Sequence, residues 1–201
     1  MPIDQKTLQL ELLLLQIAEA AQQHTKQYYF GGGFAIDLTF GGLTRPHEDI
    51  DFYPMENDTQ WWKDWFRSQG YIVSKDTDME VLPNAFSVIS TSYDNFDKNR
   101  DYLADVYPIA IGSNGGISMA VAPGTHEVWD GMLTISDGRG LWTGKSWNDV
   151  KSVSYKGRTV VVENYRTVLR QKEEYINLHN GETLSEKHLR DFERAGIKPE
   201  V

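Results

Sequence analysis

Apolar positions recur at helical spacing near the start of the chain. Residues 4–24 carry them on one predicted face, and Asp4 stands where an N-cap residue is expected. The positions on this face are Leu8, Leu12, Leu15, Ile17 and Ala18. The pattern therefore predicts an amphipathic helix.

Shorter patterns follow this helix. They predict a strand at 28–30, a break at three successive glycines, a short helix at 34–40 and a second strand at 50–53. Asp58 is placed to cap a further helix, which carries aromatic residues at helical spacing and ends before Gly70. Three strand-like stretches come next, at 71–74, 85–91 and 102–111.

The second half of the chain mixes hairpin and helix signals. Ser113–Gly116 and Lys156–Gly157 each lie between two β-rich stretches and predict hairpins. Residues 163–179 and 184–195 return to helical patterns on either side of Asn180–Gly181. No repeat and no linker divides the chain, so we expect one α+β unit over 1–201. Its core would span about 1–110 and a second region about 111–201.

Composition and charge narrow the classes of function. The chain has no cysteine, which excludes a disulfide framework, a zinc–thiolate site and a thiol nucleophile. A net charge of −9 argues against a nucleic-acid partner, because such binding depends on many Lys and Arg contacts. No apolar stretch approaches the roughly 18–20 residues of a membrane span. We therefore expect a cytoplasmic protein with neither a membrane nor a nucleic-acid partner.

Two carboxylates are predicted to share one face of the strand at 50–53. Asp49 and Asp51 are two residues apart, a spacing that places side chains on the same side of a strand. Their repulsion would be relieved by a proton or by a hard cation such as Mg²⁺. The alternative is that the pair lies on the solvent face of an edge strand.

The segment before this strand is suited to binding phosphates. Gly32 and Gly33 would let the backbone approach a triphosphate, and the helix after them would offer free N–H groups. Arg45 could add a bidentate phosphate contact. The alternatives are an ordinary tight turn for the glycines and an ion pair with Glu48 or Asp49 for Arg45.

These residues carry a resemblance to a known family. GGGFAIDLTFGGLTRPHEDIDF resembles the nucleotidyltransferase signature of the lincosamide and aminoglycoside adenylyltransferases, whose form is GG-x-A-x-D followed by T-R-x-H-x-D-I-D. LADVYPIAIGSNGGISMA is similar to the stretch that supplies their third carboxylate, which assigns that role to Asp105. The resemblance implies the nucleotidyltransferase fold, with a mixed sheet of about five strands, flanking helices, added hairpins and C-terminal helices.

The resemblance also implies roles for individual residues. Asp49, Asp51 and Asp105 would be the catalytic residues and the ligands of two Mg²⁺ ions, with Asp101 as the alternative third acid. The residues implied to bind the nucleotide are Gly32, Gly33, Arg45, His47 and Lys172, with Glu163 near it.

Three of these positions carry alternatives. His47 would contact phosphate, brace Asp49 or make a purely structural hydrogen bond. For Lys172 the alternative is a solvated lysine on a charged helix. Tyr107 departs from the family pattern, because a His often follows the third acid by two positions.

The function implied is transfer of a nucleoside monophosphate, AMP from ATP, to a hydroxyl of a small molecule. The acceptors of the drug-modifying members are lincosamide or aminoglycoside antibiotics. One alternative is a toxin or regulator of the same fold that modifies a protein or tRNA, which would call for a basic face. Another is a non-catalytic nucleotide-binding protein, which would have lost an acid. The sequence leaves the oligomeric state open.

Overall fold

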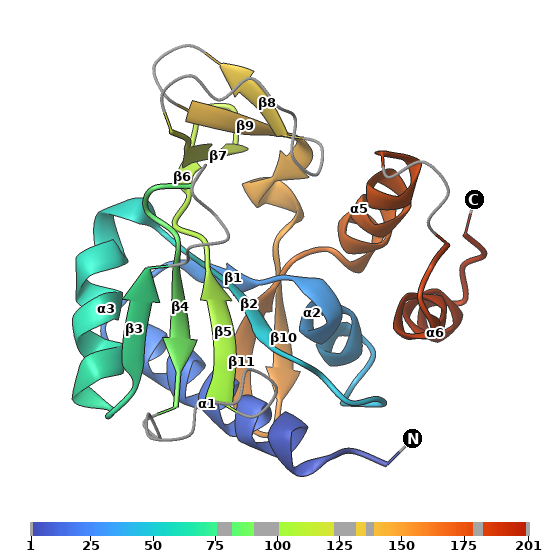
Figure 1. Ribbon diagram of the computed structural model, residues 1–201, viewed down its shortest axis with the longest axis horizontal. Helices are drawn as coiled ribbons and strands as arrows, with labels where there is room; N and C mark the ends of the chain where they lie inside the picture. The colour runs from blue at the N-terminus through green and yellow to red at the C-terminus, as the bar shows by residue number, and fades with distance from the viewer. Residues whose placement is uncertain are drawn as a thin grey trace.

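A computed structural model describes residues 2–75, 82–90, 101–122, 132–135, 139–178 and 183–199. Its main feature is a seven-stranded mixed sheet in the order β10-β11-β1-β2-β5-β4-β3 (Figure 1). These strands are β1 (Tyr28–Phe30), β2 (Ile50–Pro54), β3 (Ile72–Lys75), β4 (Phe86–Ile89), β5 (Tyr102–Val106), β10 (Lys151–Tyr155) and β11 (Arg158–Val162). Strand β2 lies at the centre, antiparallel to β1 and parallel to β5.

One face of this sheet holds the main hydrophobic core. Residues that alternate along β2 and β5, such as Ile50, Phe52, Ala104 and Val106, are fully buried there. The helices around this core are α1 (Gln5–Gln23), α2 (Gly32–Thr39), α3 (Thr59–Ser68), α5 (Tyr165–Leu178) and α6 (Glu186–Ala195). Helices α2, α5 and α6 gather on one side of the molecule, away from α3 (Figure 1).

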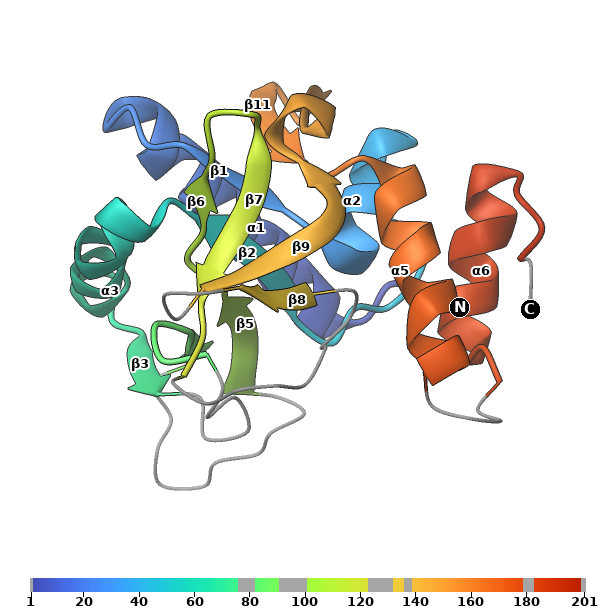
Figure 2. The same ribbon diagram turned by 90° about the horizontal axis from the view of Figure 1, so that it is seen from above.

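The opposite face of the sheet carries a second, smaller core. Tyr29, Tyr53 and Tyr107 pack there with apolar residues of a four-stranded antiparallel sheet, among them Ile117 and Met119. Its strands are β6 (Ala110–Ile111), β7 (Gly116–Ala120), β8 (Met132–Ile135) and β9 (Arg139–Ser146). Figure 2 shows this sheet lying across the first one, with β9 curving back toward the helices α2 and α5.

Two hairpins form where the turn residues predicted them. Strands β6 and β7 pair around Asn114, and β10 and β11 pair around Lys156 and Gly157. Both Lys156 and Gly157 have positive φ, at 47° and 76°, as a tight turn that matches the strand twist requires. The prediction from local turn chemistry is confirmed here.

Several predictions of local detail were wrong. Leu8 and Leu12 are 46% and 58% exposed, because the buried stripe of α1 runs through Leu10, Leu13, Leu14 and Ile17 instead. Asp58 is the N-cap residue of α3, but its side chain makes no capping hydrogen bond; its carboxylate pairs with Lys26 Nζ at 2.7 Å instead. The stretch 102–111 forms two strands, β5 and β6, rather than one.

Other predictions hold with shifted limits. Asp4 caps α1 by accepting a hydrogen bond from the Thr7 amide at 2.7 Å. Helix α2 begins at Gly32, two residues before the predicted start, so the glycines belong to its first turn. The fold class is confirmed as α+β with a mixed sheet, and the main sheet has seven strands rather than five. Thr91 and Asn180–Gly181 lie outside the described residues.

Candidate active site

Asp51 and Asp105 lie side by side on the central strands. Strands β2 and β5 are parallel, and Asp51 is in register with Asp105. Neighbouring strands are about 4.8 Å apart, and partners in register project to the same face. Both residues lie between core positions, so their carboxylates project to the opposite face, where they remain half-buried. Asp49 precedes β2 by one residue and is also half-buried. We call Asp49, Asp51 and Asp105 the acid face.

The glycine-rich start of α2 is pressed against this face. The Gly31 amide donates a hydrogen bond to the Asp51 carbonyl at 2.9 Å. Gly32 has a φ of +57°, and a Cβ there would come within 1.8 Å of Asp51 Oδ2. A Cβ on Gly33 would be 2.2 Å from Arg45 Nη2. Side chains larger than glycine are therefore excluded where the backbone meets the carboxylate and the guanidinium.

The amino end of α2 is open to an anion. Its N-cap residue, Gly31, provides no side chain to bond the first amide groups of the helix. These amides have no partner within the helix, and they carry its partial positive charge. The arrangement places these amides next to the acid face, and phosphate binding at this bend stays a prediction.

Two carboxylates of the acid face, those of Asp49 and Asp51, ionise less readily than free carboxylates. Burial, and then the neighbouring charges of Asp51 and Glu48, raise the pKa of Asp49 to about 6. Burial also raises the pKa of Asp51, although Lys172 and Lys145 oppose the shift. The Tyr107 hydroxyl has its pKa raised by burial and by all three carboxylates of the acid face. The three acids therefore act on one place, and a cation would stabilise them.

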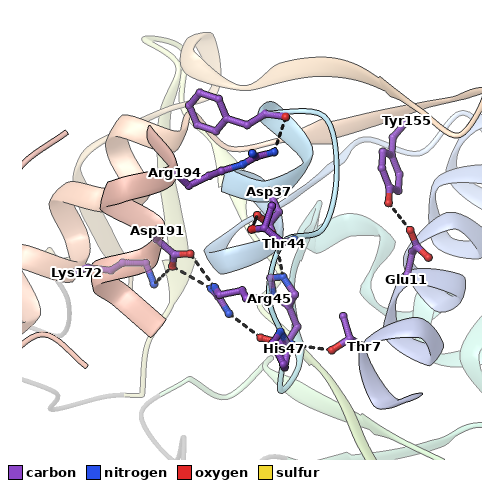
Figure 3. A network of polar contacts seen from close by, with 12 residues as sticks. Thr7, Glu11, Asp37, Thr44, Arg45, His47, Tyr155, Lys172, Asp191 and Arg194 are labelled. Atoms are coloured by element: carbon purple, nitrogen blue, oxygen red, sulfur yellow. Dashed lines mark hydrogen bonds and ion pairs between the residues drawn. The ribbon is translucent and has the colours of Figure 1, made fainter. Parts of the chain in front are cut away.

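A second group of polar residues has its charges paired. Asp37 of α2 accepts hydrogen bonds from the Thr44 amide and hydroxyl, at 3.0 and 2.6 Å, and from His47 Nε2 at 3.0 Å. Arg45 donates to both carboxylate oxygens of Asp191 in α6, at 2.8 and 2.9 Å (Figure 3). We call Asp37, Thr44, Arg45, His47 and Asp191 the anchoring network. It ties α2, the following loop and α6 together.

Hydrogen bonds set the ionisation of this network. Burial alone would raise the pKa of Asp37, but the bonds from His47 and Thr44 outweigh it and lower the pKa. Burial lowers the pKa of His47, against the opposing effect of its bond to Asp37. Its ring also stacks on Phe34 at 4.0 Å between centroids. A neutral His47 beside an ionised Asp37 is a stable structural pair.

The structure thus separates the predicted nucleotide-binding residues into two groups. Gly32 and Gly33 border the acid face, and Lys172 acts on the charge of Asp51 while its ammonium lies 3.3 Å from Asp191 Oδ2. Arg45 and His47 belong to the anchoring network. Arg45 pairs with Asp191 rather than with Glu48 or Asp49, and His47 braces Asp37 rather than Asp49. A phosphate contact by either residue stays a prediction.

Asp101 and Asp105 occupy different surroundings. Asp101 is buried, and its carboxylate accepts a hydrogen bond from the Ser90 hydroxyl at 3.1 Å, at the far end of β5 from Asp105. Asp105 accepts hydrogen bonds from the Tyr102 hydroxyl and, at 3.5 Å, from the Ser87 hydroxyl. Its register with Asp51 places Asp105, and not Asp101, next to the acid pair.

A buried lysine beside this site had no signal in the sequence. Lys145 of β9 is 4% exposed, and its ammonium lies 3.2 Å from Glu163 Oε1 and 4.9 Å from the centre of the Tyr53 ring. Glu163 follows β11 and is equally buried, and its Oε2 would lie 3.1 Å from a Cβ on Gly31. Its expected place near the nucleotide stays a prediction. Only the folding of β9 over the main sheet brings Lys145 here.

The donor chemistry of the acid face fits Mg²⁺, which prefers carboxylate oxygen ligands. The three aspartates supply only oxygen, and burial raises the pKa values of Asp49 and Asp51, a shift that a bound cation would oppose. Within the described ranges, however, no three His, Asp or Glu side chains are arranged to enclose a metal ion. The fit is therefore one of donor type and charge.

Comparison with known protein families gives one match. Residues 13–100 match the family model described as aminoglycoside-2''-adenylyltransferase. This range includes Gly32 and Gly33, the loop from Thr44 to His47, and both Asp49 and Asp51. A comparison with curated proteins gave no match. Among the helices of the described segments, none is long and apolar enough to cross a membrane.

Solved structures extend the likeness to almost the whole chain. The lincosamide antibiotic adenylyltransferase LnuA, bound to lincomycin, is 21% identical with a TM-score of 0.60, over 91% of this chain and 94% of that one. ANT(2'')-Ia in complex with adenylyl-2''-tobramycin is 17% identical with a TM-score of 0.58, over 94% and 88%. A solution structure of ANT(2'')-Ia is 19% identical with a TM-score of 0.55, over 94% of this chain and 83% of that one.

These findings confirm the resemblance, the fold and the class of enzyme expected from the sequence. The chain thus resembles the aminoglycoside-2''-adenylyltransferases over residues 13–100, and over nearly its full length it shares the fold of solved antibiotic adenylyltransferases.

Proposed function

We propose that this enzyme transfers AMP from ATP to a hydroxyl group of a small antibiotic, a lincosamide or an aminoglycoside, with Mg²⁺ as its metal. The observation that carries the proposal is the pairing of Asp51 and Asp105 in register beside the glycine-rich start of α2. Carboxylates next to free helix amides serve both halves of the reaction, the triphosphate and its attacking hydroxyl. The molecules bound in two of the solved neighbours, lincomycin and adenylyl-2''-tobramycin, support the choice of acceptor.

The chain's own residues divide the work. Asp49, Asp51 and Asp105 would hold Mg²⁺, which when bound supplies positive charge next to the phosphates. Gly32 and Gly33 let the backbone amides of α2 orient the triphosphate. Lys172 adds a cation beside Asp51, and Arg45 and His47 hold the loop that leads into β2.

The reaction balances as an in-line displacement. The acceptor oxygen forms a bond to the α-phosphorus of ATP, and the bond from that phosphorus to the β-phosphate bridging oxygen breaks, so that pyrophosphate leaves. Asp105 accepts the proton of the attacking hydroxyl, a role open to a half-buried carboxylate at the site. ATP as the co-substrate is consistent with an enzyme of the cytoplasm.

Mass spectrometry tests the proposal directly. The protein is incubated with ATP, Mg²⁺ and a panel of lincosamides, aminoglycosides and cell-extract metabolites, with the Asp51→Asn variant as the control. The expected result is one class of antibiotic whose mass increases by that of AMP, with wild-type protein only. Adenylylation of a metabolite, a protein or tRNA instead would overturn the antibiotic assignment. No transfer to any acceptor would count against the proposal as a whole.

A further inference from the structure

Lys145 and Glu163 form a buried ion pair on the same face of the sheet as the acid face. Their side chains are 2% and 5% exposed. Burying two charges costs free energy that the pair recovers only with good geometry and further hydrogen bonds. Such a pair is therefore weak evidence for a purely stabilising role.

The geometry of this pair is loose. The hydrogen bond from Lys145 Nζ to Glu163 Oε2 is 3.5 Å long, whereas charge-assisted bonds of this kind are usually about 2.7–2.9 Å. Glu163 Oε1 is buried and accepts no well-directed hydrogen bond from the described residues. The carboxylate therefore holds the ammonium near it without saturating its own acceptors, and an incoming anion can compete for the lysine.

The position of the pair points to the phosphates of the nucleotide. Glu163 borders Gly31, the residue that precedes the open amino end of α2. Lys145 lies over Tyr53, which is two residues after Asp51 on the same face of β2. Lys172 approaches Asp51 from α5, and Lys145 approaches it from β9. Two cations from different elements thus act on the carboxylate that borders the glycines.

We propose that Lys145 is a nucleotide-binding residue, whose ammonium bonds a phosphate group of the nucleoside triphosphate, and that Glu163 is the positioning residue that holds it ready. This assignment rests on the proposed function and deepens it. It also gives β9 a role, since this strand carries a cation from the second sheet to the nucleotide site. A lysine suits the task as a compact, mobile point charge.

Binding of ATP in the presence of EDTA, measured by calorimetry, tests Lys145 without metal or turnover. The Glu163→Gln variant removes the anion and keeps the lysine, and we expect it to bind ATP at least as tightly as the wild type. The double variant Lys145→Met with Glu163→Gln removes both charges, which avoids an unpaired buried carboxylate. We expect it to bind ATP about tenfold or more weakly than Glu163→Gln, as for the loss of one charge-assisted hydrogen bond.

A merely structural pair predicts the opposite result. In that case the neutral double variant binds ATP as tightly as Glu163→Gln, and the assignment of Lys145 is overturned. If circular dichroism shows that Glu163→Gln does not fold, Lys145→Arg replaces it as the reference for ATP binding. This variant keeps both the positive charge and its partner Glu163. Wild-type protein that binds no ATP, with or without Mg²⁺, would instead refute the proposed function itself.

Discussion

Most residues of the acid face and of the anchoring network come from the same short stretch of sequence, 37–51, yet the two groups are built on opposite electrostatic principles. In the network, Asp37 has hydrogen bonds to both oxygens and a lowered pKa, and Arg45 meets a complementary carboxylate in Asp191. On the acid face, burial raises the pKa values of Asp49 and Asp51; neighbouring carboxylates add to the shift at Asp49, whereas Lys172 and Lys145 oppose it at Asp51.

This difference separates structure from chemistry within one motif. A charge that the protein pairs internally contributes to the fold, whereas a charge left uncompensated is available to a ligand. The Asp, Arg and His of a signature therefore need not all touch the substrate. Here Asp37, Arg45 and His47 set the position of the loop whose end carries Asp49 and Asp51.

The largest expected effect comes from removing one carboxylate of the acid face. Asp51→Asn should reduce the rate of AMP transfer by roughly 10³-fold or more, because a proposed metal ligand and a charge at the phosphates are both lost. Its melting temperature should stay the same or rise, since a carboxylate with a raised pKa is destabilised when ionised at pH 7. Initial rates and thermal melts measure both. An active variant, or a marked fall in melting temperature, would contradict the assignment of the acid face to chemistry rather than to stability.

The next effect breaks the anchoring network. Asp191→Asn should lower the free energy of unfolding by about 3 kcal/mol, because Arg45 and Lys172 are left buried without their shared carboxylate. Urea unfolding measures the change. Glu186→Gln is the matched control, since Glu186 pairs with Arg190 on the exposed side of the same helix and should change stability by less than about 0.5 kcal/mol. Equal effects of the two substitutions would remove the distinction between buried and surface pairs.

The smallest expected effect concerns how the stability of the protein depends on pH. Burial and the charges of Lys172 and Lys187 lower the pKa of His188 in α6 to about 4 from 6.5. The unfolded chain therefore binds more protons than the folded one between these values. The contribution of His188 to stability is complete above pH 6.5 and is lost as the pH falls toward 4, on the order of 2 kcal/mol.

His188→Gln should remove this part of the acid sensitivity. Chemical unfolding of the variant and the wild type at pH 7.5, 5.5 and 4.5 gives the difference. The two proteins should diverge as the pH falls, with the variant losing less stability. Parallel curves would show that the positive charge of Lys172 and Lys187 does not reach the imidazole.

Much of the local structure was readable from the residues themselves. The hairpin at Lys156–Gly157 and the strand at 28–30 formed where they were predicted, because turn chemistry and β-branched or aromatic runs act over a few residues. The buried stripe of α1 was misjudged at Leu8 and Leu12. The whole N-terminal region of this helix is leucine-rich, so periodicity alone could not say which leucines meet the sheet.

The sequence by itself determined the order of most elements, though not of β8 and β9, and the placement of the glycines before the acidic strand, because spacing along a strand and backbone freedom are local properties. Only the tertiary structure decided that Asp105 stands in register with Asp51, that Arg45 forms an ion pair with Asp191, and that Lys145 lies next to Glu163. The residues of these three pairs are separated along the chain by 54, 146 and 18 positions, respectively. Which distant charges meet depends on how strands and helices pack, and no local pattern encodes it.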